Sequence, residues 1–226
     1  MKNTILFGFG LFLLIFASGC IDDDFIDDMV EPEITITNVI DTMGINTEFQ
    51  FQSRYLNNVG QQEDIAITWT SSDPSIISIT ESGLATAISP GTVQLSVSTA
   101  DLSFSDTIEV TVGEETIVVV PESITGTIVT TTFYVLEGTF ELSDLGGGDG
   151  LLLEINDDYL TTSALPGFYI YLSNNRNSIA NAFEIGEVTV FSGAHSYEIP
   201  DVGLKDYNFI VYYCKPFNVK VGEAEL

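Results

Sequence analysis

The side chains best suited to redox or metal chemistry in this sequence of 226 residues are two cysteines and one histidine. The thiol of Cys214 could carry redox chemistry, and the imidazole of His195 could act as a base or a ligand. His195 follows Gly193-Ala194 in a turn-like segment, which favours an exposed loop position. A lone histidine cannot form a metal site, although a Cys–His pair could contribute to one. The sequence therefore predicts no metal site and requires no cofactor, and haem or a metal at Cys214 is disfavoured.

Cys214 ends an apolar run that favours burial. Residues 209–213, with the sequence FIVYY, are apolar at both the odd and the even positions, as is typical of a strand covered on both faces. A buried free cysteine usually behaves as a small hydrophobic side chain. Lys215 is adjacent, but it points to the opposite face if the strand continues. A structural thiol is therefore favoured over a reactive one, and both interpretations stay open.

Hydrolytic catalysis finds little support in the sequence. The chain has no Gly-x-Ser-x-Gly elbow, and His195 has no identifiable nucleophile and acid partners. The adjacent acids Asp157 and Asp158 lack the spacing of a known calcium loop. Paired carboxylates for sugar cleavage stay open, because their spacing is spatial. We assign no catalytic residue and expect a protein that is not an enzyme.

The charge of the chain restricts its partners. Its 33 acidic and 6 basic residues give a formal net charge of -27. A protein that follows phosphates would work against long-range repulsion at this charge, so nucleic acid is excluded as a partner. Charged residues make up only 17% of the chain, so the excess reflects scarce Lys and Arg more than dense acid. Such a surface suits a soluble, secreted β-rich protein.

The N-terminus has the three parts of an export signal. Lys2 forms a short basic region, residues 5–16 are mostly apolar, and the small residues 17–19 precede Cys20. The apolar run is shorter than the about 20 residues of a membrane-spanning helix. The tetrad ASGC at residues 17–20 resembles the bacterial lipobox, which implies that residues 1–19 are removed and that Cys20 is lipidated. The implied partner is a membrane, which two or more acyl chains would hold stably.

An acidic segment follows Cys20 and resembles a surface-export signal. Residues 21–28, IDDDFIDD, are too charged to pack, so we expect residues 20–33 to form a tether. Some Gram-negative lipoproteins carry a similar acidic signal, and Ile21 is not the Asp of the inner-membrane retention signal. The resemblance implies the outer membrane and the cell surface. Lipid on Cys20 would also leave Cys214 without a disulfide partner in the chain.

From residue 34 onward the pattern predicts an all-β fold. Short runs rich in Val, Ile, Thr, Phe and Tyr alternate with turn residues, and no long helical period is visible. About seven strands are expected within residues 34–113, which is the density of a small immunoglobulin-like sandwich. A second series of strands runs over residues 124–226, including strands at residues 151–155 and 187–191, with the glycine-rich segment 146–150 as a hairpin connection. We therefore predict two consecutive β-sandwich domains with these bounds.

Three ordered motifs in the first domain resemble the bacterial immunoglobulin-like group 2 (Big-2) family. They are residues 69–74 (WTSSDP), 82–87 (SGLATA) and 89–92 (SPGT). Their residue types suit structural roles, with Trp69 as a core anchor and with Gly83 and Gly91 at positive φ. Members of this family are spacers or adhesive modules in surface proteins. The spacer role is favoured, because no polar groups gather into a site in the sequence.

The second domain resembles the DM13 family over most of residues 124–226. The motifs that carry the resemblance are residues 138–140 (GTF), 166–173 (PGFYIYLS), 185–186 (IG), 193–200 (GAHSYEIP) and 214–219 (CKPFNV). The family is an extracellular all-β module whose characteristic cysteine has led to a proposed redox or electron-transfer role. Cys214 matches that cysteine. Tyr213 stands before it where many members have Trp.

Two functions follow from these expectations. The leading one is a surface-anchored, non-enzymatic lipoprotein for binding or adhesion, in which the Big-2 domain spaces the DM13-like domain from the membrane. Its ligand would be an extracellular protein or a glycan. The alternative is an electron-transfer or thiol-redox protein that acts through Cys214.

Overall fold

The computed structural model describes residues 29–114, 117–118, 123–145 and 150–226 of the chain. The predicted signal peptide, the lipidation site Cys20 and the acidic run to Asp28 lie outside these residues, as does most of the glycine-rich segment. Within the described ranges, no helix is long and apolar enough to cross a membrane.

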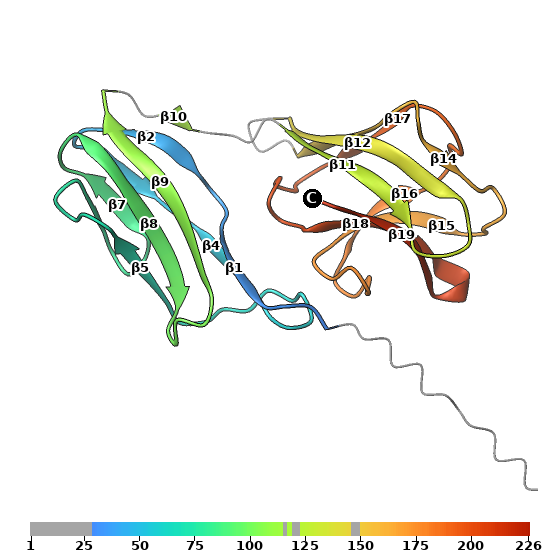
Figure 1. Cartoon of the computed structure of the whole chain (residues 1–226), viewed down its shortest axis with the longest axis horizontal. Helices are drawn as coiled ribbons and strands as arrows, with labels where there is room; N and C mark the ends of the chain where they lie inside the picture. The colour runs from blue at the N-terminus through green and yellow to red at the C-terminus, as the bar shows by residue number, and fades with distance from the viewer. Residues whose placement is uncertain (1–28, 115–116, 119–122, 146–149) are drawn as a thin grey trace, which may run out of the picture.

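The N-terminal region, which we define as residues 29–118, consists of short strands in three sheets (Figure 1). The strands are β1 (Glu33–Ile36), β2 (Ile40–Gly44), β3 (Glu48–Gln50), β4 (Ser53–Leu56), β5 (Ile67–Ser71), β6 (Ile77–Ile79), β7 (Leu84–Ala87), β8 (Gly91–Thr99), β9 (Ser105–Gly113) and β10 (Ile117–Val118). A five-stranded sheet has the order β10-β2-β9-β8-β5, a three-stranded sheet has the order β3-β7-β6, and β1 pairs with β4. All contacts between neighbouring strands are antiparallel except the parallel pair of β2 and β9.

Alternating side chains of these sheets form one core. On β8, Val93, Leu95 and Val97 point inward, as their period of two predicts, and they pack with Ile77 and Ala85 of the three-stranded sheet. Trp69 is 6% exposed in the same core, which confirms its predicted role as an anchor. Gly83 and Gly91 have φ of 85° and 152°, so their predicted positive φ is confirmed as well.

The C-terminal region, which we define as residues 123–226, contains one nine-stranded sheet. Its strands are β11 (Ser123–Thr130), β12 (Leu136–Asp144), β13 (Leu151–Ile155), β14 (Leu160–Thr161), β15 (Phe168–Ser173), β16 (Phe183–Glu187), β17 (His195–Ile199), β18 (Phe209–Cys214) and β19 (Val219–Glu225), with a 3-10 turn at Lys215–Phe217. Only two residue pairs, Val129↔Glu223 and Thr130↔Gly222, join β11 to β19. The sheet folds over at this short link, so that β11, β12, β13 and β17 form one layer and β15, β16, β18 and β19 the other (Figure 1).

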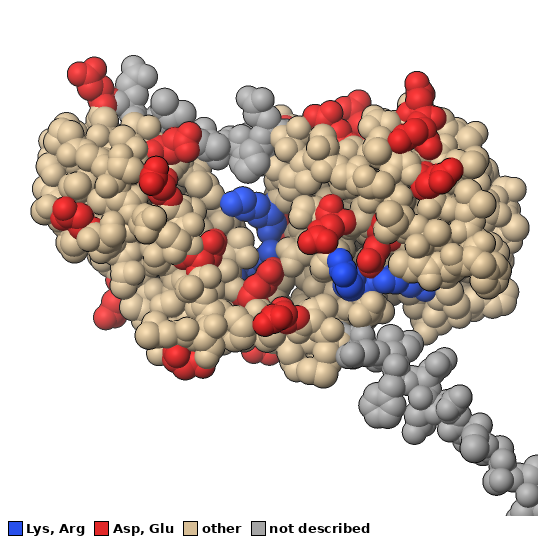
Figure 2. Space-filling model, in the orientation of Figure 1, with Lys and Arg blue, Asp and Glu red and all other residues tan. Residues whose placement is uncertain are grey.

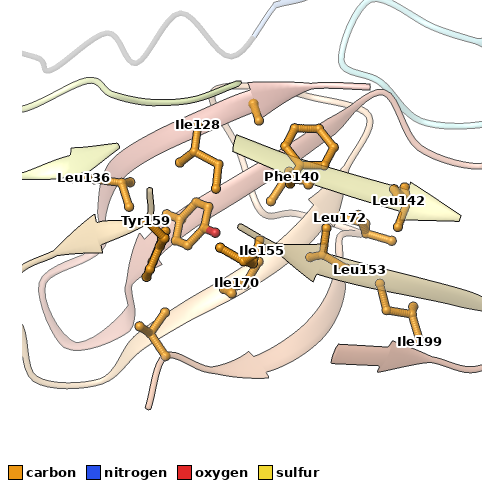
Figure 3. Packing of buried hydrophobic residues seen from close by; sticks show 14 of the residues in the cluster. Ile128, Leu136, Phe140, Leu142, Leu153, Ile155, Tyr159, Ile170, Leu172 and Ile199 are labelled. Carbon is orange, nitrogen blue, oxygen red and sulfur yellow. The ribbon is translucent and has the colours of Figure 1, made fainter. Parts of the chain in front are cut away.

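The core of the C-terminal region fills the space between these layers. Figure 3 shows Ile128, Phe140 and Leu153 from the first layer pointing toward Ile170 and Leu172 of the second. The all-β prediction is thus confirmed, and the sheets pack as sandwiches. The boundaries given above for two domains stay a prediction.

Strand β18 is covered on both faces, as the apolar run at residues 209–213 predicts. Ile210, Tyr212 and Cys214 lie in the core between the layers, whereas Val211 and Tyr213 belong to a small cluster on the outer face. The loop that follows β15 covers this outer cluster with Ile179. The strand therefore has no solvent face, which explains its unbroken hydrophobic sequence.

Two details differ from the sequence-based expectation. Glu33, which we expected to end the acidic tether, is the first residue of β1. A strand expected at residues 187–191 lies earlier, at β16 (Phe183–Glu187), because these residues pair with β15, and the hydrogen bond from the amide of Val188 to the oxygen of Phe168 ends the pairing. Residues 189–194 then form a connection to β17.

Candidate functional site

Cys214, the predicted redox candidate, is a buried thiol. Its side chain is 1% exposed, and its Sγ donates a hydrogen bond to the main-chain oxygen of Pro166 at 3.2 Å. It also lines the base of an apolar hollow of about 320 Å³, whose rim carries the exposed rings of Phe133 and Phe217. The strand does not continue through Lys215, which begins the 3-10 turn, and its Nζ lies 2.6 Å from Glu184 and 3.7 Å from the centre of the Tyr169 ring. The thiol thus has a structural hydrogen bond and a neighbouring hollow, but no charged partner at its sulfur is shown.

His195 does not occupy the exposed loop that we expected. It begins β17 and is half-buried, with its ring 4.8 Å from the ring of Tyr159 and 5.5 Å from that of Tyr197. Its Nδ1 bonds the oxygen of Gly193 at 2.9 Å. The prediction was wrong because pairing of β17 with β13 extends to His195, which faces Ile155 in the register.

A cluster of buried polar atoms surrounds this histidine. The hydroxyl of Tyr197 and the Nε2 of His195 are buried without a hydrogen-bond partner, and the buried hydroxyls of Tyr159 and Tyr212 interact with each other. Burial raises the pKa of all three tyrosines, most of all that of Tyr212. The sequence does not predict this cluster, because each of the three tyrosines stands in its strand or turn like an ordinary core residue.

No described part of the chain assembles a metal site: residues 29–114, 117–118, 123–145 and 150–226 contain no group of three or more His, Cys, Asp and Glu side chains that could hold an ion. The carboxylate of Asp158 instead accepts hydrogen bonds from the main-chain N of Thr139 at 2.9 Å and from its hydroxyl at 3.1 Å. This acid joins the turn after β13 to β12, which is a structural role.

The two regions meet in a polar junction built around Arg54. This residue of β4 is 7% exposed and donates hydrogen bonds to the oxygen of Asp206 and, at 3.3 Å, to Oδ1 of Asn208. Its Nη2 lies 3.8 Å from the carboxylate of Glu33, which also accepts a hydrogen bond of 2.6 Å from Asn208. Desolvation lowers the pKa of the guanidinium, while the charges of Glu33 and Asp206 raise it. Figure 2 shows cationic side chains at the boundary between the two halves, whereas acidic ones are spread over both.

A loop of the N-terminal region docks beside Arg54. Gly60 has a φ of 74°, and a Cβ at this position would lie 2.5 Å from the main-chain oxygen of Asn174. Asn175, which is 2% exposed, donates to the oxygen of Val59 at 3.1 Å. The loop is held in shape by Asn57, whose Oδ1 accepts from the amides of Val59 and Gln61, each at 3.0 Å. A residue without a side chain is needed for this close approach.

A cleft of about 600 Å³ opens at this junction and takes its walls from both regions. Its polar lining consists of Arg54, Gln61, Gln62, Asn174, Asn181, Asp201 and Asp206. Phe183 and Tyr207 add aromatic surface. Two buried polar atoms of the lining have no partner, namely Nε of Arg54 and Oδ1 of Asn174. Clefts of this size between packed units are the commonest place for small-molecule sites.

The sequence contained one signal for this cleft. In β4, Tyr55 packs against the N-terminal core, whereas Arg54 and Leu56 lie on the opposite face and are also buried, so an arginine and a leucine alternate on a second covered face. Lys and Arg are scarce in this chain, which makes a buried one notable. The residues that face Arg54 lie more than 150 positions away, and no local pattern connects them to it.

The N-terminal end of the described chain lies beside this junction. Glu33 of β1 is bonded to Asn208, and the N-terminal end of the described chain lies at the boundary of the two regions (Figure 1). A spacer in series would place this end far from the C-terminal region. This arrangement therefore argues against the predicted spacer role of the N-terminal region.

Comparisons with known proteins give no family. Neither a protein-family model nor a curated protein matches the chain. Among solved structures, the S-layer protein rSbsC(31-844) is similar with a TM-score of 0.31 and 14% identity over 86% of this chain. Domains 4 and 5 of S-layer protein SbsC give the same values and are covered to 96%. This chain spans only 27% of the length of rSbsC(31-844).

Proposed function

We propose that this protein is a non-enzymatic binding module of the cell surface, anchored in the outer membrane by lipid on Cys20. The observation that carries the binding role is the junction cleft of about 600 Å³, which has a buried arginine and polar walls from both regions. The resemblances to the Big-2 and DM13 families support an extracellular setting. The anchor is supported by the basic, apolar and small-residue parts of residues 1–19.

In this proposal the N-terminal region is half of the binding site. It supplies Arg54 and the loop of Gly60 to the cleft, and it meets the C-terminal region through Glu33. An acidic tether ending at this junction would hold the anchor close to the cleft, so both regions would stand at the same end of the tether.

The anchor is tested with the two cysteines as a matched pair. The full chain is expressed in a Gram-negative host as wild type, Cys20→Ala and Cys214→Ala, and labelled with palmitate. Wild type and Cys214→Ala should incorporate label, stay with the outer membrane and be cleaved by protease added to intact cells. Cys20→Ala should lose the label and the membrane. Equal membrane retention of Cys20→Ala, or protection of the wild type from external protease, would refute the proposal.

A second candidate function uses Cys214 as a redox or cofactor-binding thiol. The apolar hollow of about 320 Å³ beside it favours this alternative, since an apolar group could reach the sulfur from there. The 1% exposure of the side chain and its bond to Pro166 favour a structural thiol. An absorbance spectrum of the purified chain and a native thiol titration decide between them. A chromophore, or a thiol that reacts before the protein unfolds, would support the redox function.

A further inference from the structure

We infer that the junction cleft binds a neutral saccharide. This inference rests on the proposed function and deepens it by naming the class of ligand. Its first support is the composition of the walls. Gln61, Gln62, Asn174 and Asn181 bring side-chain amides from both regions. Each amide offers donors and acceptors next to each other, and a ring of hydroxyls requires both along its edge.

Two side chains of the cleft lining, Arg54 and Asn174, each keep one buried polar atom without a hydrogen-bond partner. Nε of Arg54 is a buried donor, and Oδ1 of Asn174 is a buried acceptor. The orientation of the Asn174 amide is set, because its Nδ2 donates to the oxygen of Asp206 at 3.0 Å. A hydroxyl group can accept from the first and donate to the second, whereas a carboxylate or phosphate offers only acceptors. Neighbouring hydroxyls of a sugar meet this requirement.

The charges of the cleft disfavour an anionic ligand. Arg54 is the cation of its described lining, and Glu33 already lies 3.8 Å from the guanidinium. Asp201 and Asp206 add two exposed carboxylates to the walls. The whole chain has a formal net charge of -27, which repels anions at long range. An uncharged polyhydroxyl ligand carries no such penalty.

Two aromatic rings complete the arrangement. Phe183 and Tyr207 line the cleft, and both also pack against the core of the C-terminal region. A ring anchored in this way offers an apolar face at little entropic cost. The C–H face of a sugar ring is apolar and can cover such a surface while its hydroxyls bond the amides. The opposite wall is fixed by the bonds of Asn57 within the Gly60 loop, so the cleft is preorganised.

The test measures saccharide binding by the soluble mature chain, residues 21–226. The probes are immobilised short neutral oligosaccharides of glucose, galactose, mannose and N-acetylglucosamine, with uronic-acid and sulfated counterparts, followed by calorimetry on those retained. The binding variant is Gln61→Ala with Asn181→Gly, which removes one exposed amide from each wall. Gly suits position 181, because Asn181 has a φ of 61°. The matched control is Gln94→Ala, an exposed amide of β8 outside the cleft.

We expect retention of neutral oligosaccharides over acidic ones. The double variant should bind about 30-fold more weakly, since two hydrogen bonds of about 1 kcal/mol each are lost. Gln94→Ala should bind as the wild type does, and all three proteins should unfold at similar temperatures. Preference for acidic sugars, full binding by the folded double variant, or no saccharide binding by the wild type would each overturn the inference. None of these outcomes affects the anchoring result for Cys20→Ala, so failure of the ligand and failure of the proposed function are separable.

Discussion

The guanidinium of Arg54 donates a hydrogen bond to the main-chain oxygen of Asp206, which lies 152 positions later in the chain. The same guanidinium bonds Asn208, and Asn208 bonds Glu33 at the start of β1. One buried side chain thus connects two separate cores through a ring of polar contacts. The geometry of the cleft depends on this connection, because its walls belong to different regions.

Loss of this side chain should uncouple the two regions. Arg54→Gln leaves the oxygen of Asp206 and the amide of Asn208 without their charged donor, so we expect the free energy of unfolding to fall by about 1.5–3 kcal/mol. Guanidinium chloride denaturation followed by fluorescence and circular dichroism measures the change. The unfolding transitions reported by fluorescence and by circular dichroism should no longer coincide if the two regions unfold separately.

The control for this variant is Arg176→Gln. Arg176 is 42% exposed and faces Glu223 and Glu225 of its own region, so its loss should cost less than about 1 kcal/mol. Equal effects of the two variants would show that the Arg54 contacts do not hold the junction.

The contact at Gly60 can be separated from its backbone conformation. Gly60 and Gly193 have φ of 74° and 83°, but a Cβ at Gly60 would meet Asn174, whereas a Cβ at Gly193 would meet nothing within 4 Å. Both Ala variants should pay about 1 kcal/mol or more of backbone strain. Only Gly60→Ala should also displace its loop from Asn174 and increase the radius of gyration in small-angle scattering. If the two variants have the same scattering profile, the loop does not dock as described.

Local patterns predicted those parts of the fold that local chemistry determines. The strand at residues 151–155 and the both-sided burial of β18 follow from runs of hydrophobic residues, and Gly83 follows from its turn. His195 was misplaced because one more residue pair, with Ile155, extends β17. Strand ends depend on such pairings, which the sequence of one strand does not contain.

The cleft could not be predicted, because its residues are brought together by the packing of two regions. Arg54 lies on the face of β4 opposite the core-facing Tyr55, and its acceptors lie in the loop before β18. The amides of Gln61 and Asn174 each resemble ordinary loop residues in the sequence. The sequence favoured a spacer role for the N-terminal region, because no polar residues cluster along the chain. The polar groups of the cleft come together only in the folded protein.

The buried tyrosines should make the fold sensitive to alkaline pH. Burial raises the pKa of Tyr212 well above its ordinary value of 10.0, so the folded protein retains a proton that the unfolded chain loses. Stability is then complete below about pH 10 and falls as the pH rises above it, by about 1.4 kcal/mol per pH unit for each such tyrosine. Urea denaturation at a series of alkaline pH values measures this slope.

Tyr212→Phe identifies the contribution of this tyrosine. The hydroxyl of Tyr212 interacts with the buried hydroxyl of Tyr159, so its removal should lower the free energy of unfolding at neutral pH by about 1 kcal/mol or less. Above pH 10 the free energy of unfolding should fall less steeply with pH in the variant than in the wild type. The difference between the two slopes should correspond to one proton. Tyr55→Phe, which alters a half-buried ring of the N-terminal core, serves as the control. A loss of well over about 1 kcal/mol at neutral pH in Tyr212→Phe would show that the hydroxyl is held by more than the contact with Tyr159, and an unchanged alkaline slope would show that Tyr212 ionises as freely in the folded protein as in the unfolded chain.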